Sequence, residues 1–200
     1  MRMLAYMSGM ETAVSIALGI GLAAAVGFRV FLPLLVASIA AYTGHLHLDA
    51  NFAWLGSLPA MTMLGVAAVV EVLAYYVPAI DNLLDTITTP LALAAGTIVS
   101  AAVITDLPPL IKWSTAIIAG GGVAAITQGV TTLVRAKSTA FTAGVGNPVI
   151  STVEMIAAVV VALLAVLAPL IAIALVAAFC LLVVRAVRRF LRASSAAKTS

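Results

Sequence analysis

Three ionisable residues and one amide lie inside long apolar stretches of the sequence: Arg29, Glu71, Glu154 and Gln128. A charged side chain in the interior of a bilayer costs several kcal/mol unless it is paired or hydrated, so its presence there indicates a function by default. The functional interpretation pairs Arg29 with Glu71 or Glu154 around a cavity at mid-membrane. One carboxylate is then available to bind a proton or a cation.

Each of these four residues also has a structural interpretation. Arg29 and Glu154 could lie at a membrane interface, where arginine extends its charge toward water and the helix dipole favours a carboxylate near a helix N-terminus. Gln128 could instead donate a hydrogen bond to a neighbouring helix. The sequence leaves both interpretations open.

Two further polar groups lie near predicted helix ends. Asn147-Pro148 is typical of a helix start, with the asparagine as cap and the proline in the first turn. If this loop enters the membrane, its N–H groups would instead form an anion site. Asp81 and Asp85 lie one helical turn apart and could share a cation with Asn82, or be solvated at the membrane surface.

The one spacing typical of a metal site is His45-x-His47-x-Asp49. In an extended loop these three side chains share one face and offer imidazole and carboxylate ligands; loops at membrane surfaces also carry such residues for solubility. With both histidines in one loop, no Ser-His-Asp triad can be assembled. The single cysteine, Cys180, excludes Cys-based metal centres. We expect no enzymatic activity and no cofactor.

The elements that position these residues must be membrane helices. Of the 200 residues, 64% are hydrophobic and 8% are charged, against about 45–50% and 25% in soluble domains. Seven of the ten basic residues lie at or beyond Arg135, which is the asymmetry of cytoplasmic loops and tails rather than a stripe for nucleic acid. We therefore expect the lipid bilayer, and not nucleic acid, as a partner.

The apolar segments predict about six spans, each needing about 20 residues. The first run, Ala13–Tyr42, exceeds this length and is interrupted by Arg29 and Pro33, so a tilted, kinked or broken helix is predicted. The next segments are a span at Leu58–Val77, a short interfacial helix or loop at Ala79–Thr89, and spans at Pro90–Ile104 and Lys112–Val134.

The last apolar run, Val149–Val184, is nearly twice the length of a span, with Pro169 near its middle. Because the loop at Arg135 and the tail from Arg185 to Arg192 should both face the cytoplasm, two short spans fit better than one long kinked helix. This gives an all-α polytopic membrane bundle, with both termini cytoplasmic. Residues 1–192 form one membrane domain and 193–200 a polar cytoplasmic tail.

Two sets of three spans are what an inverted repeat requires. Small residues at every fourth position match between the runs Gly19–Gly27 and Gly121–Gly129, and Leu64–Pro78 aligns with Met155–Pro169. A 3+3 inverted repeat is the resulting hypothesis. Small-residue ladders also indicate close helix packing, within the chain or in a homodimer.

Several phrases of the sequence resemble a bacterial family of small polytopic membrane proteins, the domain of unknown function family 4126. The resemblance runs from about Glu11 to Arg192 and is carried by Gly27–Pro33, Trp54–Ala60, Pro78–Asp85, Gly120–Gly122 and Asn147–Glu154. It implies the membrane architecture but no established activity. Departures from the family pattern, each removing charge, are Tyr75-Tyr76, Thr89, Gln128 and Met155.

The function that we expect is a small transporter or channel-like protein for an ion or small solute. Glu71, with Glu154, would bind a cation or proton, and Arg29 would act as the counter-charge. The alternative is a non-transporting assembly or lipid-organising protein that packs through its Gly/Ala ladders. A membrane enzyme acting on lipid or quinone is a second rival. The sequence determines neither the substrate, nor the coupling ion, nor the oligomeric state.

Overall fold

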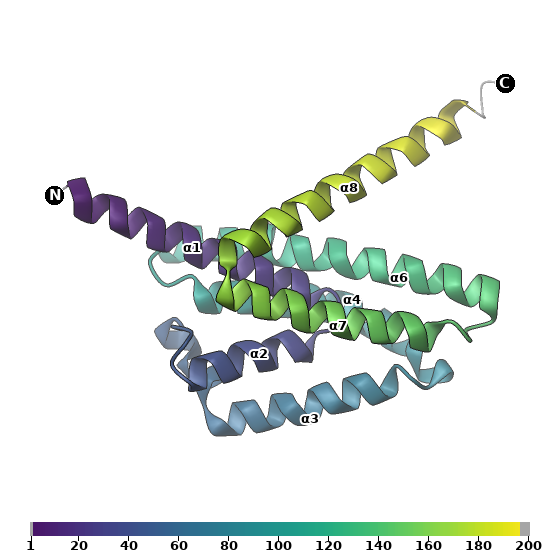
Figure 1. Cartoon of the computed structure of the whole chain (residues 1–200), viewed down its shortest axis with the longest axis horizontal. Helices are drawn as coiled ribbons and strands as arrows, with labels where there is room; N and C mark the ends of the chain where they lie inside the picture. Colours follow the sequence, from purple (N-terminus) through teal and green to yellow (C-terminus); the bar gives the residue numbers. More distant parts are fainter. Residues whose placement is uncertain (1, 197–200) are drawn as a thin grey trace.

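The computed structural model describes residues 2–196, with the side chains of 2–8, 78–79, 81–85, 190–191 and 193–196 outside the description. This part of the chain consists of helices joined by short loops and turns, without strands. Its helices form a bundle elongated along one axis (Figure 1). The predicted all-α fold is confirmed.

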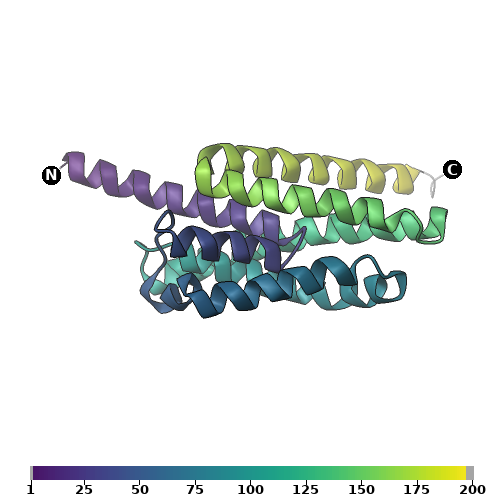
Figure 2. The ribbon, with the colours of Figure 1, turned by 60° about the horizontal axis from the view of Figure 1, so that its bottom comes forward.

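The first apolar run forms a hairpin of two helices. Helix α1, Arg2–Val26, ends at a short turn, and α2, Phe31–Tyr42, runs back beside it (Figures 1 and 2). Pro33 lies in the first turn of α2, where its missing N–H leaves no helical hydrogen bond unmade. The turn packs closely on α6, Gly122–Thr142, because a Cβ at Gly27 would lie 2.6 Å from the carbonyl oxygen of Ala124. The predicted break is therefore a reversal of direction.

The second region contains a bent element and a long helix. A 3-10 helix, Ala50–Gly56, meets α3, Leu58–Ala74, at 63°. Helix α4, Pro78–Val103, follows and contains Pro90 in its interior. The prediction of a separate interfacial segment at Ala79–Thr89 is wrong, because these residues continue directly into the span.

One unbroken helical stretch of 34 residues runs from Pro109 to Thr142. It consists of α5, Pro109–Thr115, a π-helical segment, Ala116–Gly121, and α6. A Cβ at Gly120 would lie 2.9 Å from the carbonyl oxygen of Gly96 in α4. This glycine triplet lies in a membrane helix packed against its neighbour.

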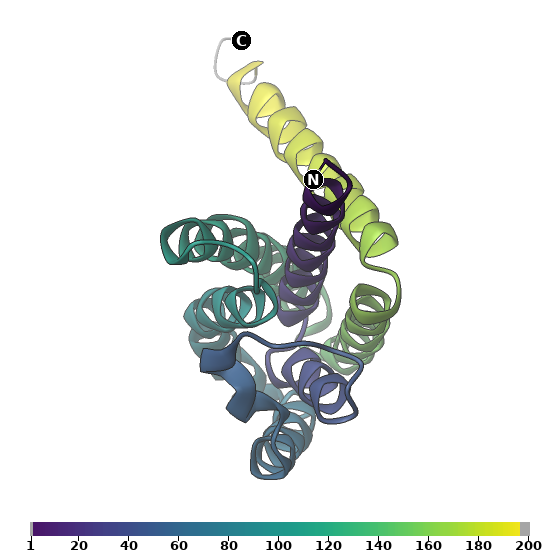
Figure 3. The ribbon, with the colours of Figure 1, turned by 90° about the vertical axis from the view of Figure 1, so that its left-hand side faces the viewer.

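The last apolar run forms two antiparallel helices, α7, Asn147–Leu167, and α8, Pro169–Ala196 (Figure 2). The predicted division at Pro169 is correct, and α8 continues past the predicted domain boundary at residue 192. Viewed along the bundle, α1 lies between α4 and α6 on one side and α7 and α8 on the other, and α3 lies at the edge (Figure 3).

The bundle is apolar on the outside and built from small and polar residues inside, as expected of a protein surrounded by lipid. Exposed residues include Met63, Leu110 and Leu167, which are 74%, 81% and 77% accessible. Within the described residues, five helices are long and apolar enough to cross a membrane, or six if the bent pair counts as one span. The chain therefore has the architecture of a multi-pass membrane protein.

The start of α1 and the end of α8 lie at opposite ends of the long axis (Figures 1 and 2). The α1–α2 hairpin contributes to this separation, because it returns the chain to the end from which it came.

Candidate functional site

The turn between α1 and α2 directs Arg29 into the bundle. Its side chain is 1% exposed, and its Nη2 donates hydrogen bonds to the backbone oxygen, at 3.1 Å, and the hydroxyl of Ser151 on α7. The same nitrogen lies 3.5 Å from Oε2 of Glu154. Of the two predicted partners of Arg29, Glu71 and Glu154, the structure confirms the pairing with Glu154. Both side chains are buried in the bundle.

Glu154 also pairs with a second arginine that sequence reasoning missed. Arg135 on α6 donates from Nε to Oε1 of Glu154 at 3.2 Å and from Nη2 to Oε2. Arg135 is only 3% exposed. The sequence had instead indicated that Arg135 lies in a cytoplasmic loop at the end of the span Lys112–Val134. The available signal was its position two helical turns after Gln128, on the same face of α6.

An aromatic ring completes this group. The guanidinium carbons of Arg29 and Arg135 lie 3.8 Å and 4.0 Å from the ring centroid of Tyr75, which directly follows α3. Cation–π contacts of this kind gain strength away from water, and Tyr75 is buried. We call Arg29, Tyr75, Arg135, Ser151 and Glu154 the arginine cluster.

A hydrogen-bond chain connects the arginine cluster to α4. The hydroxyl groups of Tyr75 and Thr88 are 3.3 Å apart, and Nε2 of Gln128 donates to Thr88 at 3.0 Å. Gln128 therefore bridges α6 and α4, as its structural interpretation predicts. Thr88 also lines a cavity between α3 and α4, so the hydrogen-bond chain ends at the wall of that cavity.

Glu71, on α3, binds the start of α2 through both oxygens of its carboxylate. Its Oε1 accepts from the N–H of Val30 at 2.8 Å, and its Oε2 accepts from the N–H of Phe31 at 3.1 Å. These are unsatisfied donors at a helix N-terminus, and a carboxylate there is favoured by the helix dipole. Glu71 thus fixes the hairpin while remaining buried, with 5% of its surface exposed.

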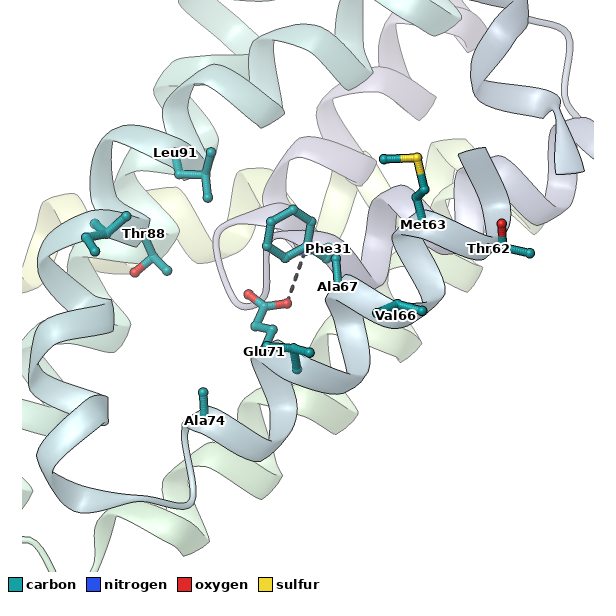
Figure 4. A pocket seen from close by; sticks show the side chains of 11 residues that line it. Phe31, Thr62, Met63, Val66, Ala67, Glu71, Ala74, Thr88 and Leu91 are labelled. Atoms are coloured by element: carbon teal, nitrogen blue, oxygen red, sulfur yellow. Dashed lines mark hydrogen bonds between the residues drawn. The ribbon is translucent and has the colours of Figure 1, made fainter. Parts of the chain in front are cut away.

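A cavity of about 670 Å³ lies beside this carboxylate, between α3 and α4. Figure 4 shows Glu71 reaching from α3 toward Phe31, with Thr88 and Leu91 on the opposite wall. Most of the lining is apolar, and Glu71 is the one ionisable residue among the described side chains that line it. The site can therefore present a buried carboxylate to a molecule that enters between the two helices.

The other predicted polar residues take different positions. Asn147 is buried and donates from Nδ2 to the hydroxyl of Thr139 at 3.0 Å, so its side chain joins α7 to α6. The expected capping bond is not made, because Gly146 occupies the cap position of α7. Asp81 and Asp85 fall in the first turns of α4, and their side chains lie outside the described part of the structure.

The predicted metal residues do not converge. Among the described residues, no three His, Cys, Asp or Glu side chains are grouped to hold a metal ion. Asp49 accepts a hydrogen bond from Lys112 Nζ at 2.7 Å, and His45 contacts Thr43. The hydrogen bond from Lys112 lowers the pKa of the Asp49 carboxyl below its ordinary value. Asp49 is therefore part of an ion pair.

Comparison with known proteins identifies the chain at the level of its family. No curated protein and no solved structure matches it. The profile of one family, described as Domain of unknown function (DUF4126), matches residues 16–189, a range that contains the arginine cluster, Glu71 and the whole cavity. The chain therefore belongs to the DUF4126 family.

Proposed function

We propose that this protein is a small membrane transporter or channel-like protein for an ion or small solute, with Glu71 as its binding carboxylate. The observation that carries the proposal is the position of Glu71. Its buried carboxylate contacts the turn of the α1–α2 hairpin and lines a cavity of 670 Å³. Ionisable residues inside membrane bundles characteristically mark ion and substrate pathways.

Glu71 is better suited to bind a cation or proton than Glu154. Two guanidinium groups already contact Glu154. The described contacts of Glu71 are with neutral backbone N–H groups. Each carboxylate oxygen has a second lone pair, which a ligand in the cavity can use.

Ligand binding at Glu71 would also bias the position of the hairpin. The formal charges of Arg29, Arg135, Glu71 and Glu154 sum to zero. A bound cation or proton adds one positive charge beside the turn that holds Arg29 and weakens the hydrogen bonds that the carboxylate accepts from the start of α2. A ligand shifts a conformational equilibrium only through such differential interactions, and here occupancy would favour a displaced hairpin.

The proposal places the protein in a bacterial inner membrane, with the C-terminal end of α8 in the cytoplasm. The turn between α6 and α7 lies at the same end of the bundle as this basic segment (Figure 2), and basic residues gather on the cytoplasmic side. The N-terminal end of α1 then lies on the opposite side. This revises the predicted orientation to accommodate the hairpin.

The proposal keeps an inverted repeat, but of two helices in each half instead of the predicted three. Helices α3 and α7 run in opposite directions, and a proline starts the helix after each of them (Figure 2). Helices α1 and α6 run in the same direction, so their matching small residues do not fit an inverted pair. We therefore assign the repeat to α3–α4 and α7–α8.

The alternative function is an assembly or lipid-organising role that uses the glycine ladders. Gly27, Gly120 and Gly121 are already occupied by packing within the chain. A Cβ at Gly122 or Gly129 on α6 would meet open space, so these two glycines favour the alternative as a contact face for a second copy.

The test is flux through purified protein in proteoliposomes, read with a pH-sensitive dye and a panel of cations. We expect Glu71→Gln to reduce flux at least tenfold, because the amide removes the charge. The matched control is Glu11→Gln on the exposed part of α1, which should leave flux unchanged. Gly129→Leu should also leave flux unchanged, whereas the alternative predicts that it disrupts assembly.

Because Glu71 also holds α2, each variant is accompanied by a thermal unfolding curve in detergent. Glu71→Asp keeps the charge on a shorter side chain and should retain part of the flux. Flux of wild type and folded Glu71→Gln that is equal for every cation would overturn the proposal.

A further inference from the structure

We infer that the cavity between α3 and α4 binds a lipophilic cation, an apolar chain that ends in a protonated amine, which enters sideways from the bilayer. The inference deepens the proposed function, on which it rests, by naming the substrate class of Glu71. It follows from three properties of the cavity: its walls, its inner end and its volume.

The walls of the cavity are suited to an apolar chain. Met63, Val66 and Val70 on α3 are 74%, 65% and 59% exposed, and Ile87 on α4 is 53% exposed. Such exposed apolar side chains on a membrane helix face lipid, so the opening between α3 and α4 is directed toward the bilayer. A hydrated ion would find few hydrogen-bond partners along this route. An alkyl chain exchanges lipid contacts for equally apolar side-chain contacts, so its transfer into the cavity costs little free energy of desolvation.

The inner end of the cavity selects the head group. The Glu71 carboxylate accepts hydrogen bonds and carries a negative charge, so a protonated amine provides both a donor and the complementary charge. An anionic lipid phosphate would be repelled by the same carboxylate. A neutral alcohol could donate a hydrogen bond but would lack the charge attraction, which is strong where water is scarce.

The volume of the cavity distinguishes a chain from a protein helix. At 670 Å³ it falls within the roughly 300–1,000 Å³ of small-molecule sites. A helix is about 10 Å wide with a pitch of 5.4 Å, so each turn occupies roughly 400 Å³. The cavity therefore holds fewer than two turns of a helix from a second copy, but accommodates a single alkyl chain with its amine.

The test is photo-crosslinking in nanodiscs of neutral lipid. The probe is a long-chain alkylamine with a diazirine in its chain, and the matched probe is the alcohol of the same chain. Crosslinked residues are located by mass spectrometry. We expect the amine to label the walls of the cavity at least tenfold more than the alcohol does, and unlabelled alkylamine to compete.

Variants connect the label to the cavity. Ala67→Phe fills the cavity from α3, and Val70→Trp obstructs its opening from an exposed position that needs no repacking. Both should reduce labelling by the amine at least tenfold, as should Glu71→Gln. The control is Leu73→Phe, on the exposed surface of α3 outside the cavity lining, which should leave labelling unchanged.

Equal labelling by amine and alcohol, or labelling that survives both Ala67→Phe and Val70→Trp, would overturn the inference. Crosslinks between two copies at these walls would also overturn it, since they would identify a partner helix as the occupant. Glu71-dependent flux of inorganic cations without amine labelling would leave the proposed function standing and refute this inference alone. Labelling that depends on Glu71, without flux of any ligand, would support the binding site and refute transport.

Discussion

The ion pair at Asp49 and the arginine cluster use the same chemistry in different surroundings. Asp49 and Lys112 join the loop before the 3-10 helix to α5, with a 2.7 Å contact and 15% of the Asp49 side chain exposed. In the arginine cluster, one carboxylate serves two guanidinium groups, and the three side chains are between 1% and 5% exposed. Water can therefore reach Asp49 and replace Lys112 as its partner, whereas water does not reach Glu154 and its two arginines.

The Asp49–Lys112 pair joins two neighbouring segments only, whereas the residues of the arginine cluster depend on one another. The Asp49 carboxylate also accepts from the N–H of Asn51, so the loop keeps part of its structure without Lys112. Glu154 receives Arg29 from the hairpin turn and Arg135 from α6. Any movement of the hairpin must therefore change the electrostatics at Glu154, which is the property that a transporter requires.

The largest effect is expected for Glu154→Gln. This change leaves two buried guanidinium groups without their carboxylate, and breaking a buried pair in this way costs roughly 3–5 kcal/mol. Thermal unfolding in detergent should show a large fall in the midpoint. Asp106→Asn, at an exposed carboxylate, is the matched control and should leave the midpoint unchanged. A midpoint for Glu154→Gln equal to that of the control would contradict the interdependence of the cluster.

The sequence predicts the membrane helices and a carboxylate partner for Arg29, either Glu71 or Glu154, because charge in an apolar run has few ways to be satisfied. The structure selects Glu154. The sequence also predicts the division at Pro169, because the basic residues at both ends of the last two spans must lie on one side. These arguments depend on composition and on the sign of charge. Both properties can be read without knowing how the helices pack.

Composition and charge do not determine the direction in which the chain leaves a turn, or which face of a helix is buried. A Gly-Phe-Arg-Val turn permits a kink or a reversal. The reversal depends on tertiary contacts, namely the packing of Gly27 on α6 and the hydrogen bonds from the start of α2 to Glu71. Lipid is as apolar as the interior, so hydropathy does not separate a buried face from an exposed one. Arg135 and Tyr75 were missed for this reason: a basic or aromatic residue near a helix end is equally typical of the membrane interface.

An intermediate effect is expected for Gly27→Ala at the base of the hairpin turn. The added Cβ would lie 2.6 Å from the carbonyl oxygen of Ala124, and such overpacking typically costs about 1–3 kcal/mol. The matched change is Gly129→Ala on α6, where the Cβ meets open space. Thermal unfolding should separate the two variants, and equal midpoints would show that the turn can move away from α6 without penalty.

The smallest effect is expected for Asp49→Asn, which removes the negative charge of the partly buried pair with Lys112. At neutral pH we expect a loss of about 1 kcal/mol or less, as for other ion pairs in contact with water. Because Lys112 lowers the pKa of Asp49 in the folded protein, the ionised carboxylate stabilises the fold above its unfolded pKa. This stabilisation is lost as the pH falls through the lowered pKa.

The difference between the unfolding midpoints of wild type and Asp49→Asn should therefore shrink as the pH falls below the ordinary pKa of an aspartate and vanish once Asp49 is protonated in the folded protein. High salt at neutral pH should reduce it as well. A difference that persists in acid would show that Asp49 acts through its hydrogen bond to the N–H of Asn51, a role that depends on the shape of the side chain and not on its charge. The contrast with Glu154 would then rest on hydrogen-bond geometry at one site and on charge at the other.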